Sequence, residues 1–226
     1  MQNDSKRNGI EFYQCARRLK ISSICVYLGS NEGDDPSFGA AVDEFGAILA
    51  TNQIRLVCGG GGRGLMRRLV LSVIEHGGQV LAITPQFLVD SEGRNTNVQE
   101  QIVTEGMHER KRLMFEQSDA FVALPGGVGT LEELVEQLTW AQLGRHNKPI
   151  GIYNHCGFWD PLLELFAQMR ERMLITAKEP IRYGVAHKVS QIIPVMCGEM
   201  ESLGRVHKID RRTMQLFTGS NHQSTS

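Results

Sequence analysis

The stretch that decides the fold spans residues 120–133 and reads AFVALPGGVGTLEE. Its first five residues form a continuous apolar run, which is typical of a strand buried on both faces of a sheet. Pro125 and three glycines end that run, and apolar residues at helical spacing then extend from Leu131 to about Leu143. The stretch therefore predicts a strand, a glycine-rich turn and a helix in direct succession.

The same alternation of short apolar runs and helix-period segments continues over most of the chain. Further strands are expected at Ile24–Leu28, Arg55–Cys58, Val80–Ile83 and Pro149–Tyr153, with a short one at Ile102–Val103. Helices are expected at Ser37–Ala50, Leu65–His76, Met107–Gln117, Trp159–Leu174 and Ala186–Met196, and a loop at Asp90–Gln101. This alternation predicts an α/β fold with a doubly wound, mostly parallel sheet and helices on both faces.

Composition excludes several classes of protein. The 24 Lys and Arg residues balance 25 Asp and Glu residues, so no bulk positive field favours a nucleic acid or a membrane as partner. No apolar run approaches the length of about 18 residues that spans a bilayer, and the polar start at Met1–Gly9 does not resemble a signal peptide. We expect one cytoplasmic globular domain over residues 1–203, followed by a basic and polar tail at 204–226.

Five cysteines are spaced widely and include no C-x-x-C pair. This pattern argues against a disulfide framework or a zinc site and fits a reducing compartment.

Glycine is in excess, with 24 residues against an average usage of about 7%, and it gathers in two clusters. The first cluster matches G-x-G-x-x-G through Gly59, Gly61 and Gly64. A dinucleotide site also needs an acidic residue at the end of the next strand, where this chain has Thr84-Pro85-Gln86. An NAD site is therefore disfavoured, and the cluster either shapes a turn or contacts a nucleotide.

The second cluster contains Gly126, Gly127 and Gly129 and precedes a helix. Converging backbone N–H groups and the positive end of a helix dipole suit one phosphate group. No lysine follows the glycines, so this is not a triphosphate-binding loop. We therefore expect a nucleoside monophosphate.

Two charged residues near these glycines have two interpretations each. Glu133 follows Thr130 by three residues, which fits a helix capping box but also places a carboxylate within reach of a ribose. Arg110 belongs to a charged helix start that fits either a solvated face or a planar contact to a substrate.

The segment Met107-His108-Glu109-Arg110-Lys111, followed by Pro125–Glu133, resembles the paired signature of the Lonely Guy family. Members are cytokinin riboside 5'-monophosphate phosphoribohydrolases, and an older label of the family is "possible lysine decarboxylase". The resemblance runs from about Ile24 to Leu174.

This resemblance implies a Rossmann-like fold, a homodimer or larger homo-oligomer, and hydrolysis of an N-glycosidic bond with no cofactor and no metal. It implies that Arg110 and Glu133 are catalytic. The residues that it implies for substrate binding are Glu92, Lys111, Gly127, Val128, Gly129, Thr130 and Thr139. The loop around Glu92 departs from the family pattern, and Gly106 replaces an Asp that often precedes the Met-His pair.

The expected reaction converts AMP or an N6-modified riboside 5'-monophosphate to free base and ribose 5-phosphate. The alternative is a non-catalytic nucleotide or cofactor carrier on the same fold. A carrier needs the phosphate-binding turn but no carboxylate facing the anomeric carbon, so the presence of both Arg110 and Glu133 favours the enzyme.

Overall fold

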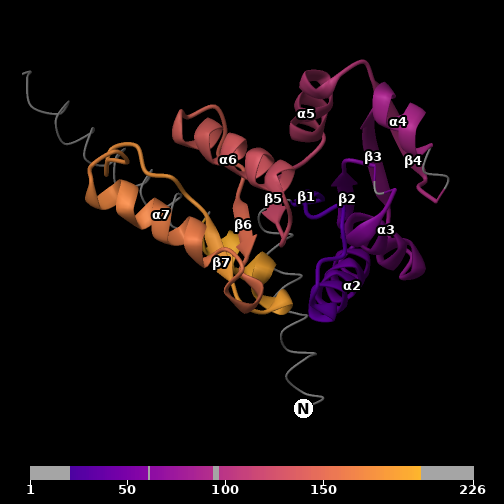
Figure 1. Cartoon of the computed structure of the whole chain (residues 1–226), viewed down its shortest axis with the longest axis horizontal. Helices are drawn as coiled ribbons and strands as arrows, with labels where there is room; N and C mark the ends of the chain where they lie inside the picture. The colour runs from indigo at the N-terminus through magenta and orange to yellow at the C-terminus, as the bar shows by residue number, and fades with distance from the viewer. Residues whose placement is uncertain (1–20, 61, 94–96, 200–226) are drawn as a thin grey trace, which may run out of the picture.

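The chain folds around one parallel sheet (Figure 1). This computed structural model describes residues 21–60, 62–93 and 97–199. Within these ranges the strands are β1 (Ser23–Tyr27), β2 (Arg55–Cys58), β3 (Val80–Pro85), β4 (Glu100–Thr104), β5 (Ala120–Ala123), β6 (Ile150–Tyr153) and β7 (Gly184–Ala186). Their order across the sheet is β4-β3-β2-β1-β5-β6-β7, and each neighbouring pair is parallel. The predicted doubly wound, Rossmann-like α/β fold is confirmed.

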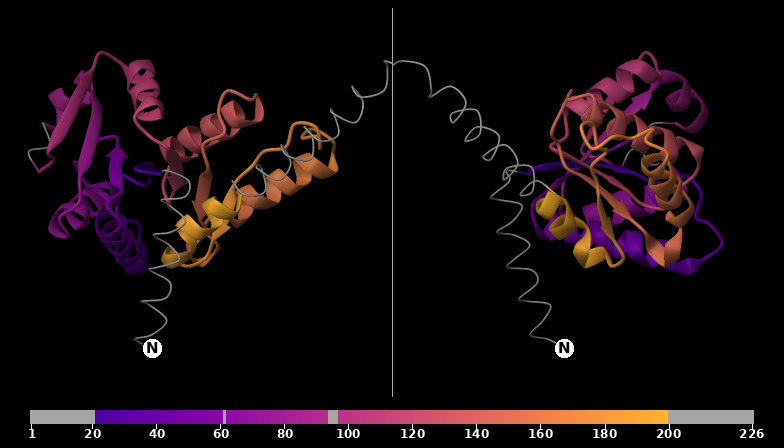
Figure 2. Two further views of the ribbon diagram at one scale, coloured as in Figure 1. Left: turned by 180° about the vertical axis from the view of Figure 1, so that it is seen from behind. Right: turned by 90° about the vertical axis from the view of Figure 1, so that its left-hand side faces the viewer.

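Helices cover both faces of the sheet (Figures 1 and 2). The α-helices are α2 (Pro36–Thr51), α3 (Gly64–Glu75), α4 (Gln86–Glu92), α5 (Met107–Glu116), α6 (Val128–Gln142) and α7 (Asp160–Glu171). Short 3₁₀ turns occur at η1 (His155–Gly157) and η2 (Val189–Gln191), and residues 192–199 are helical.

The sheet separates two apolar cores because successive side chains of a strand point to opposite faces. In β1, Ile24 and Val26 belong to the core under α2, α3 and the helical residues 192–199. Cys25 and Tyr27 belong to the core under α5, α6 and α7. A strand buried on both sides is continuously apolar, which is why β1 and β5 are so clear in the sequence.

Two segments differ from the expectation. Asp90–Gln101 was expected to be a loop, but α4 continues to Glu92 and β4 begins at Glu100. β4 lies at the edge of the sheet beside β3, where polar residues are tolerated, so its apolar pattern is weak. The expected helix at Ala186–Met196 is wrong at its start, because Ala186 ends β7 and pairs with Tyr153 of β6.

The cysteines also differ in part from the expectation. Cys25, Cys58 and Cys156 are free thiols, as the spacing predicts. Cys197 is disulfide-bonded, so the expectation of unpaired cysteines is wrong at that position.

The order of the strands reverses between β1 and β5, and the chain segments that leave these two strands lie close together. The Gly29 N–H donates to the carbonyl of Pro125 at 3.1 Å. A Cβ atom on Gly126 would lie 2.7 Å from the Gly29 nitrogen and 2.2 Å from the Thr130 hydroxyl. Glycine at position 126 is therefore required by close packing at the point where doubly wound sheets bind ligands.

Gly64, the first residue of α3, is constrained in two ways. Its φ of +58° lies in the left-handed region, and a Cβ there would lie 2.2 Å from the carbonyl oxygen of Ser30. Gly77, just after α3, has a similar φ of +77°, but a Cβ there would meet nothing within 4 Å. A comparison of the two positions therefore distinguishes the cost of the left-handed backbone, which both share, from the cost of steric overlap, which only Gly64 has.

We predict that Gly64→Ala destabilises the protein more than Gly77→Ala. The control carries only the left-handed penalty of about 1–2 kcal/mol. Gly64→Ala adds an overlap with backbone atoms and costs at least about 1 kcal/mol more. Urea unfolding followed by circular dichroism measures both losses, and equal losses would contradict this account.

Candidate active site

A cavity of about 710 Å³ opens at the carboxyl ends of β1, β2 and β3, between the N-terminal ends of α3, α5 and α6. This volume lies within the range of about 300–1,000 Å³ typical of small-molecule sites. Both glycine clusters contribute to its lining, the first through Gly59, Gly60 and Gly62 and the second through Gly127 and Gly129. The fold therefore brings together two clusters that are more than 60 residues apart in the sequence.

Arg110 and Glu133 face each other in the wall of this cavity. Arg110 comes from the first turn of α5 and Glu133 from the second turn of α6. The Nη2 of Arg110 donates to Oε1 of Glu133 at 3.1 Å, and both residues are buried, with 7% and 8% exposure. The solvated-face interpretation of Arg110 is therefore wrong.

Gly59 determines how closely the guanidinium approaches the end of β2. A Cβ at this position would lie 2.1 Å from Nη2 of Arg110. The Nε atom of Arg110 is buried and has no hydrogen-bond partner among the residues that the structure describes. This N–H therefore remains available to a bound ligand, because a buried donor is costly to leave unpaired.

Burial raises the pKa of the Glu133 carboxyl, and the Arg110 guanidinium opposes that shift. The raised pKa follows because a buried site disfavours the charged form of a carboxyl group. Perturbed carboxyl groups in a cleft are typical of functional sites, although structural ion pairs perturb pKa values as well.

The capping-box interpretation of Glu133 is also wrong. Gly127, in an extended conformation, is the N-cap of α6, so the helix begins at Val128 rather than at Leu131. Thr130 then lies inside the first turn, and the carboxylate of Glu133 accepts from Arg110. The glycine turn sets where α6 begins, and this start places the Glu133 side chain in the cavity rather than against the backbone of the N-cap.

The first turn of α6 presents its backbone to the cavity. A Cβ at Gly127 or Gly129 would meet no protein atom within 4 Å, so packing within the chain does not require glycine there. Thr130 is 4% exposed and lines the cavity beside them, and Val128 lines it too, although 83% of Val128 is exposed. The unpaired N–H groups of a helix N-terminus bind anions, so this turn suits a phosphate.

Lys111 is held by carboxylates on α6 and does not line the cavity. Its ammonium group donates to Glu132, and to Glu136 at 3.4 Å. Burial lowers the pKa of Lys111, but the two carboxylates raise it by more than burial lowers it, so the pKa lies above its ordinary value. Glu132 lines the cavity and lies between it and the Lys111 ammonium group. Lys111 is therefore next to Arg110 in the sequence but outside the cavity lining.

The remaining predicted residues have different positions. Gly64 packs against Ser30 outside the cavity lining, and Gly61 lies outside the described residues. Glu92 ends α4, next to Gly93 of the lining, but its side chain lies outside the described part. Thr139 is exposed on α6 away from the cavity, and its hydroxyl donates to the Val135 carbonyl at 2.8 Å. Glu92 and Thr139 stay predictions.

The cavity also contains residues that the sequence analysis did not select. They include Ser30, Asn31, Met66, Arg67, Thr84 and Gln101. Thr84 and Gln101 lie on neighbouring strands, and the Gln101 amide donates to the Thr84 hydroxyl at 3.2 Å. The signal for Ser30, Asn31 and Thr84 was their position at the carboxyl end of a parallel strand.

Within the described residues, no helix is both long enough and apolar enough to cross a membrane.

Comparison with known proteins identifies relatives over most of this chain. A rice (Oryza sativa subsp. japonica) protein named as a probable cytokinin riboside 5'-monophosphate phosphoribohydrolase is 47% identical over 151 residues, which cover 67% of this chain and 68% of that protein. An Arabidopsis thaliana protein named as a cytokinin riboside 5'-monophosphate phosphoribohydrolase is 38% identical over 204 residues, covering 83% of this chain and 94% of the relative.

Among solved structures, the molybdenum cofactor carrier protein of Chlamydomonas reinhardtii matches with a TM-score of 0.59. It is 20% identical, and the match covers 80% of this chain and 99% of the carrier, which shows a shared fold. The family model described as "Possible lysine decarboxylase" matches residues 66–196. This match covers more than half of the chain and includes α5, β5 and α6, which carry Arg110 and Glu133. The chain therefore belongs to this family, the one that the paired Lonely Guy signature indicates.

Proposed function

We propose that this chain hydrolyses the N-glycosidic bond of AMP or of an N6-modified, cytokinin-type riboside 5'-monophosphate. The products are the free base and ribose 5-phosphate. The observation that carries the proposal is the buried Arg110–Glu133 pair beside the N-terminus of α6. The names of the relatives support the class of substrate.

The first turn of α6 binds the 5'-phosphate. Backbone N–H groups at Gly127–Thr130 and the Thr130 hydroxyl supply donors, and the positive end of the helix dipole faces the anion. Binding the phosphate orients the ribose, so that the anomeric carbon and its bond to the base lie toward the interior of the cavity.

Glu133 acts on the ribose. Cleavage of the glycosidic bond develops positive charge at the anomeric carbon, as in other glycoside hydrolyses. The ionised carboxylate stabilises that charge and orients the attacking water, whose oxygen forms the new bond to carbon. One proton of the water leaves toward the carboxylate, and the base departs with the electron pair of the broken C–N bond and takes up a proton.

Arg110 keeps Glu133 ionised and contacts the substrate. Its Nη2 is engaged by the carboxylate, while its Nε has no partner among the described residues and is the donor available to a ligand. A positive group near the departing base stabilises the electron density that the base gains.

We also propose a homo-oligomer of single-domain, cytoplasmic subunits. Val135 on α6 and Leu143 just after it are exposed at 38% and 68%, and apolar side chains gathered on a surface are candidates for an interface between subunits. Light scattering of the purified chain measures the assembly.

Glu133→Gln is the test of the proposed reaction. We expect kcat for base release to fall by about 10²- to 10⁴-fold, because glutamine cannot stabilise the positive charge or accept a proton. AMP binding, measured by calorimetry, changes little because the amide oxygen still accepts from Arg110. Chromatography of free base from AMP and from isopentenyladenine riboside monophosphate provides the rate and the substrate preference.

Glu136→Gln is the matched control for that experiment. Glu136 lies on the same helix but does not line the cavity, so its variant should retain turnover. Undiminished turnover by Glu133→Gln would overturn the assignment, and AMP binding without base release by the unaltered protein would favour the carrier.

The pH dependence of kcat/KM provides a second test. The active form of Glu133 is the carboxylate, so activity falls as pH decreases through its raised pKa, and the acid limb should lie above the ordinary value of 4.5. Arg110→Gln removes a charge that lowers this pKa, so the limb should move to still higher pH. Arg110→Lys keeps the charge and is the matched control. An acid limb that stays in place in Arg110→Gln would contradict this coupling.

Gly129→Ala separates ligand binding from folding. Alanine in a helix is favoured over glycine by about 0.5–1 kcal/mol, so stability should be unchanged or higher. The added methyl group would lie where the phosphate binds, and KM for AMP should rise by about 10-fold or more. Gly198→Ala is the control, since Gly198 is also helical and uncrowded but lies outside the cavity lining. Equal KM values for both variants would exclude this turn as the phosphate site.

A further inference from the structure

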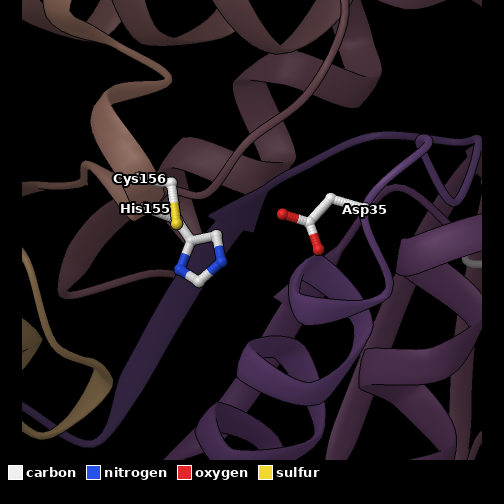
Figure 3. A group of neighbouring side chains, drawn as sticks. All are labelled: Asp35, His155 and Cys156. Atoms are coloured by element: carbon white, nitrogen blue, oxygen red, sulfur yellow. The ribbon is translucent and has the colours of Figure 1, made fainter.

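A second group of reactive side chains lies outside the cavity. The ligand atoms of Asp35, His155 and Cys156 all lie within 4.8 Å of one another, and no other group of three such residues occurs in the described ranges. Figure 3 shows the Asp35 carboxylate facing the His155 imidazole, with the Cys156 sulfur beside the ring. None of the three lines the cavity that contains Arg110 and Glu133.

We propose that Asp35, His155 and Cys156 bind a zinc ion that links the segment before α2 to the turn after β6. Asp35 is the N-cap of α2, and His155 and Cys156 are the first two residues of η1. Two of the ligands are adjacent and the third is 120 residues earlier, so no C-x-x-C spacing marks the site in the sequence.

The donor set selects the metal. Sulfur, imidazole nitrogen and carboxylate oxygen are the ligands that Zn²⁺ takes, whereas Mg²⁺ and Ca²⁺ prefer oxygen alone. A thiolate and a carboxylate neutralise the two positive charges of the ion. Zinc–ligand bonds of about 2.0–2.3 Å place tetrahedral ligand atoms roughly 3.3–3.8 Å apart. The three ligand atoms lie within 4.8 Å of one another, so no pair needs to close by more than about 1.5 Å.

Neighbouring hydrogen bonds orient the imidazole for this role. The Tyr153 hydroxyl lies 2.8 Å from Nδ1 and the Ser37 hydroxyl 2.7 Å from Nε2 of His155. With the Nδ1 proton donated to Tyr153, the Nε2 lone pair faces α2 and accepts from the Ser37 hydroxyl, a bond that a metal ion at Nε2 would replace. Metal-binding histidines typically donate their other ring N–H to such a partner.

The backbone positions the other two ligands. The Ser37 N–H donates to Oδ1 of Asp35 at 2.8 Å, and Oδ2 remains for the metal. Cys156 has a φ of +49° and a ψ of 30°, a left-handed conformation that non-glycine residues seldom adopt. Strained residues of this kind concentrate at ligand sites, and here the turn directs the thiol toward His155.

Cobalt titration tests the site without depending on hydrolysis. Untagged full-length protein, stripped with a chelator, should bind one equivalent of Co²⁺ with a thiolate-to-cobalt charge-transfer band and intense tetrahedral d–d bands. One equivalent of Zn²⁺ should abolish both sets of bands. Absence of the charge-transfer band, or binding far from one equivalent, would overturn the proposal.

Variants identify the ligands. Cys156→Ser should abolish the charge-transfer band, and Asp35→Asn and His155→Ala should each weaken Zn²⁺ binding by at least about 10-fold. Tyr153→Phe, which removes the partner of Nδ1, should weaken it by about 10- to 100-fold. His76→Ala, an exposed histidine at the end of α3, is the matched control and should bind normally. A band that persists in Cys156→Ser would refute the site, whereas base release should stay unchanged in that variant.

Discussion

The candidate active site depends on one buried ion pair, the contact between Arg110 and Glu133. Neither group is stable alone where it is buried, because an unpaired buried charge is costly. The pair therefore requires that α5 and α6 begin at the same edge of the sheet and that Gly59 leave room for the guanidinium. This contact forms because of three features of the fold, namely the order of the strands, the positions at which α5 and α6 begin, and the absence of a side chain at Gly59.

The same pair explains how the site combines binding and reactivity. The helix N-terminus at Gly127–Thr130 provides a place for a phosphate without any lysine after the glycines. A phosphate bound there would lie about one helical turn, or roughly 5 Å, from Glu133. A ribose 5'-phosphate spans a similar length between its phosphate and its anomeric carbon. The fold thus places the proposed phosphate anchor and the carboxylate on α6, and Arg110 on the preceding helix, α5.

Much of this could be read from local patterns. The continuous apolar strands, the helix periodicity and the glycine turn before Glu133 depend on residues within one or two helical turns of each other. Local signals made β4 too short and missed β7, because short edge strands are stabilised by their partners β3 and β6 rather than by their own composition. They also left open whether Glu133 was a cap, since the choice of Gly127 as N-cap depends on the packing of the whole turn.

The sequence by itself determined the fold class, the glycine turn before α6 and the identity of the two catalytic candidates, because spacing along a strand or helix fixes which side chains share a face. Only the tertiary structure decided which distant residues meet. It placed Gly59 against Arg110, paired Lys111 with Glu132, and brought Asp35 to His155 and Cys156. The reason is that strand order, which no local pattern encodes, sets the contacts between loops that are far apart in the chain.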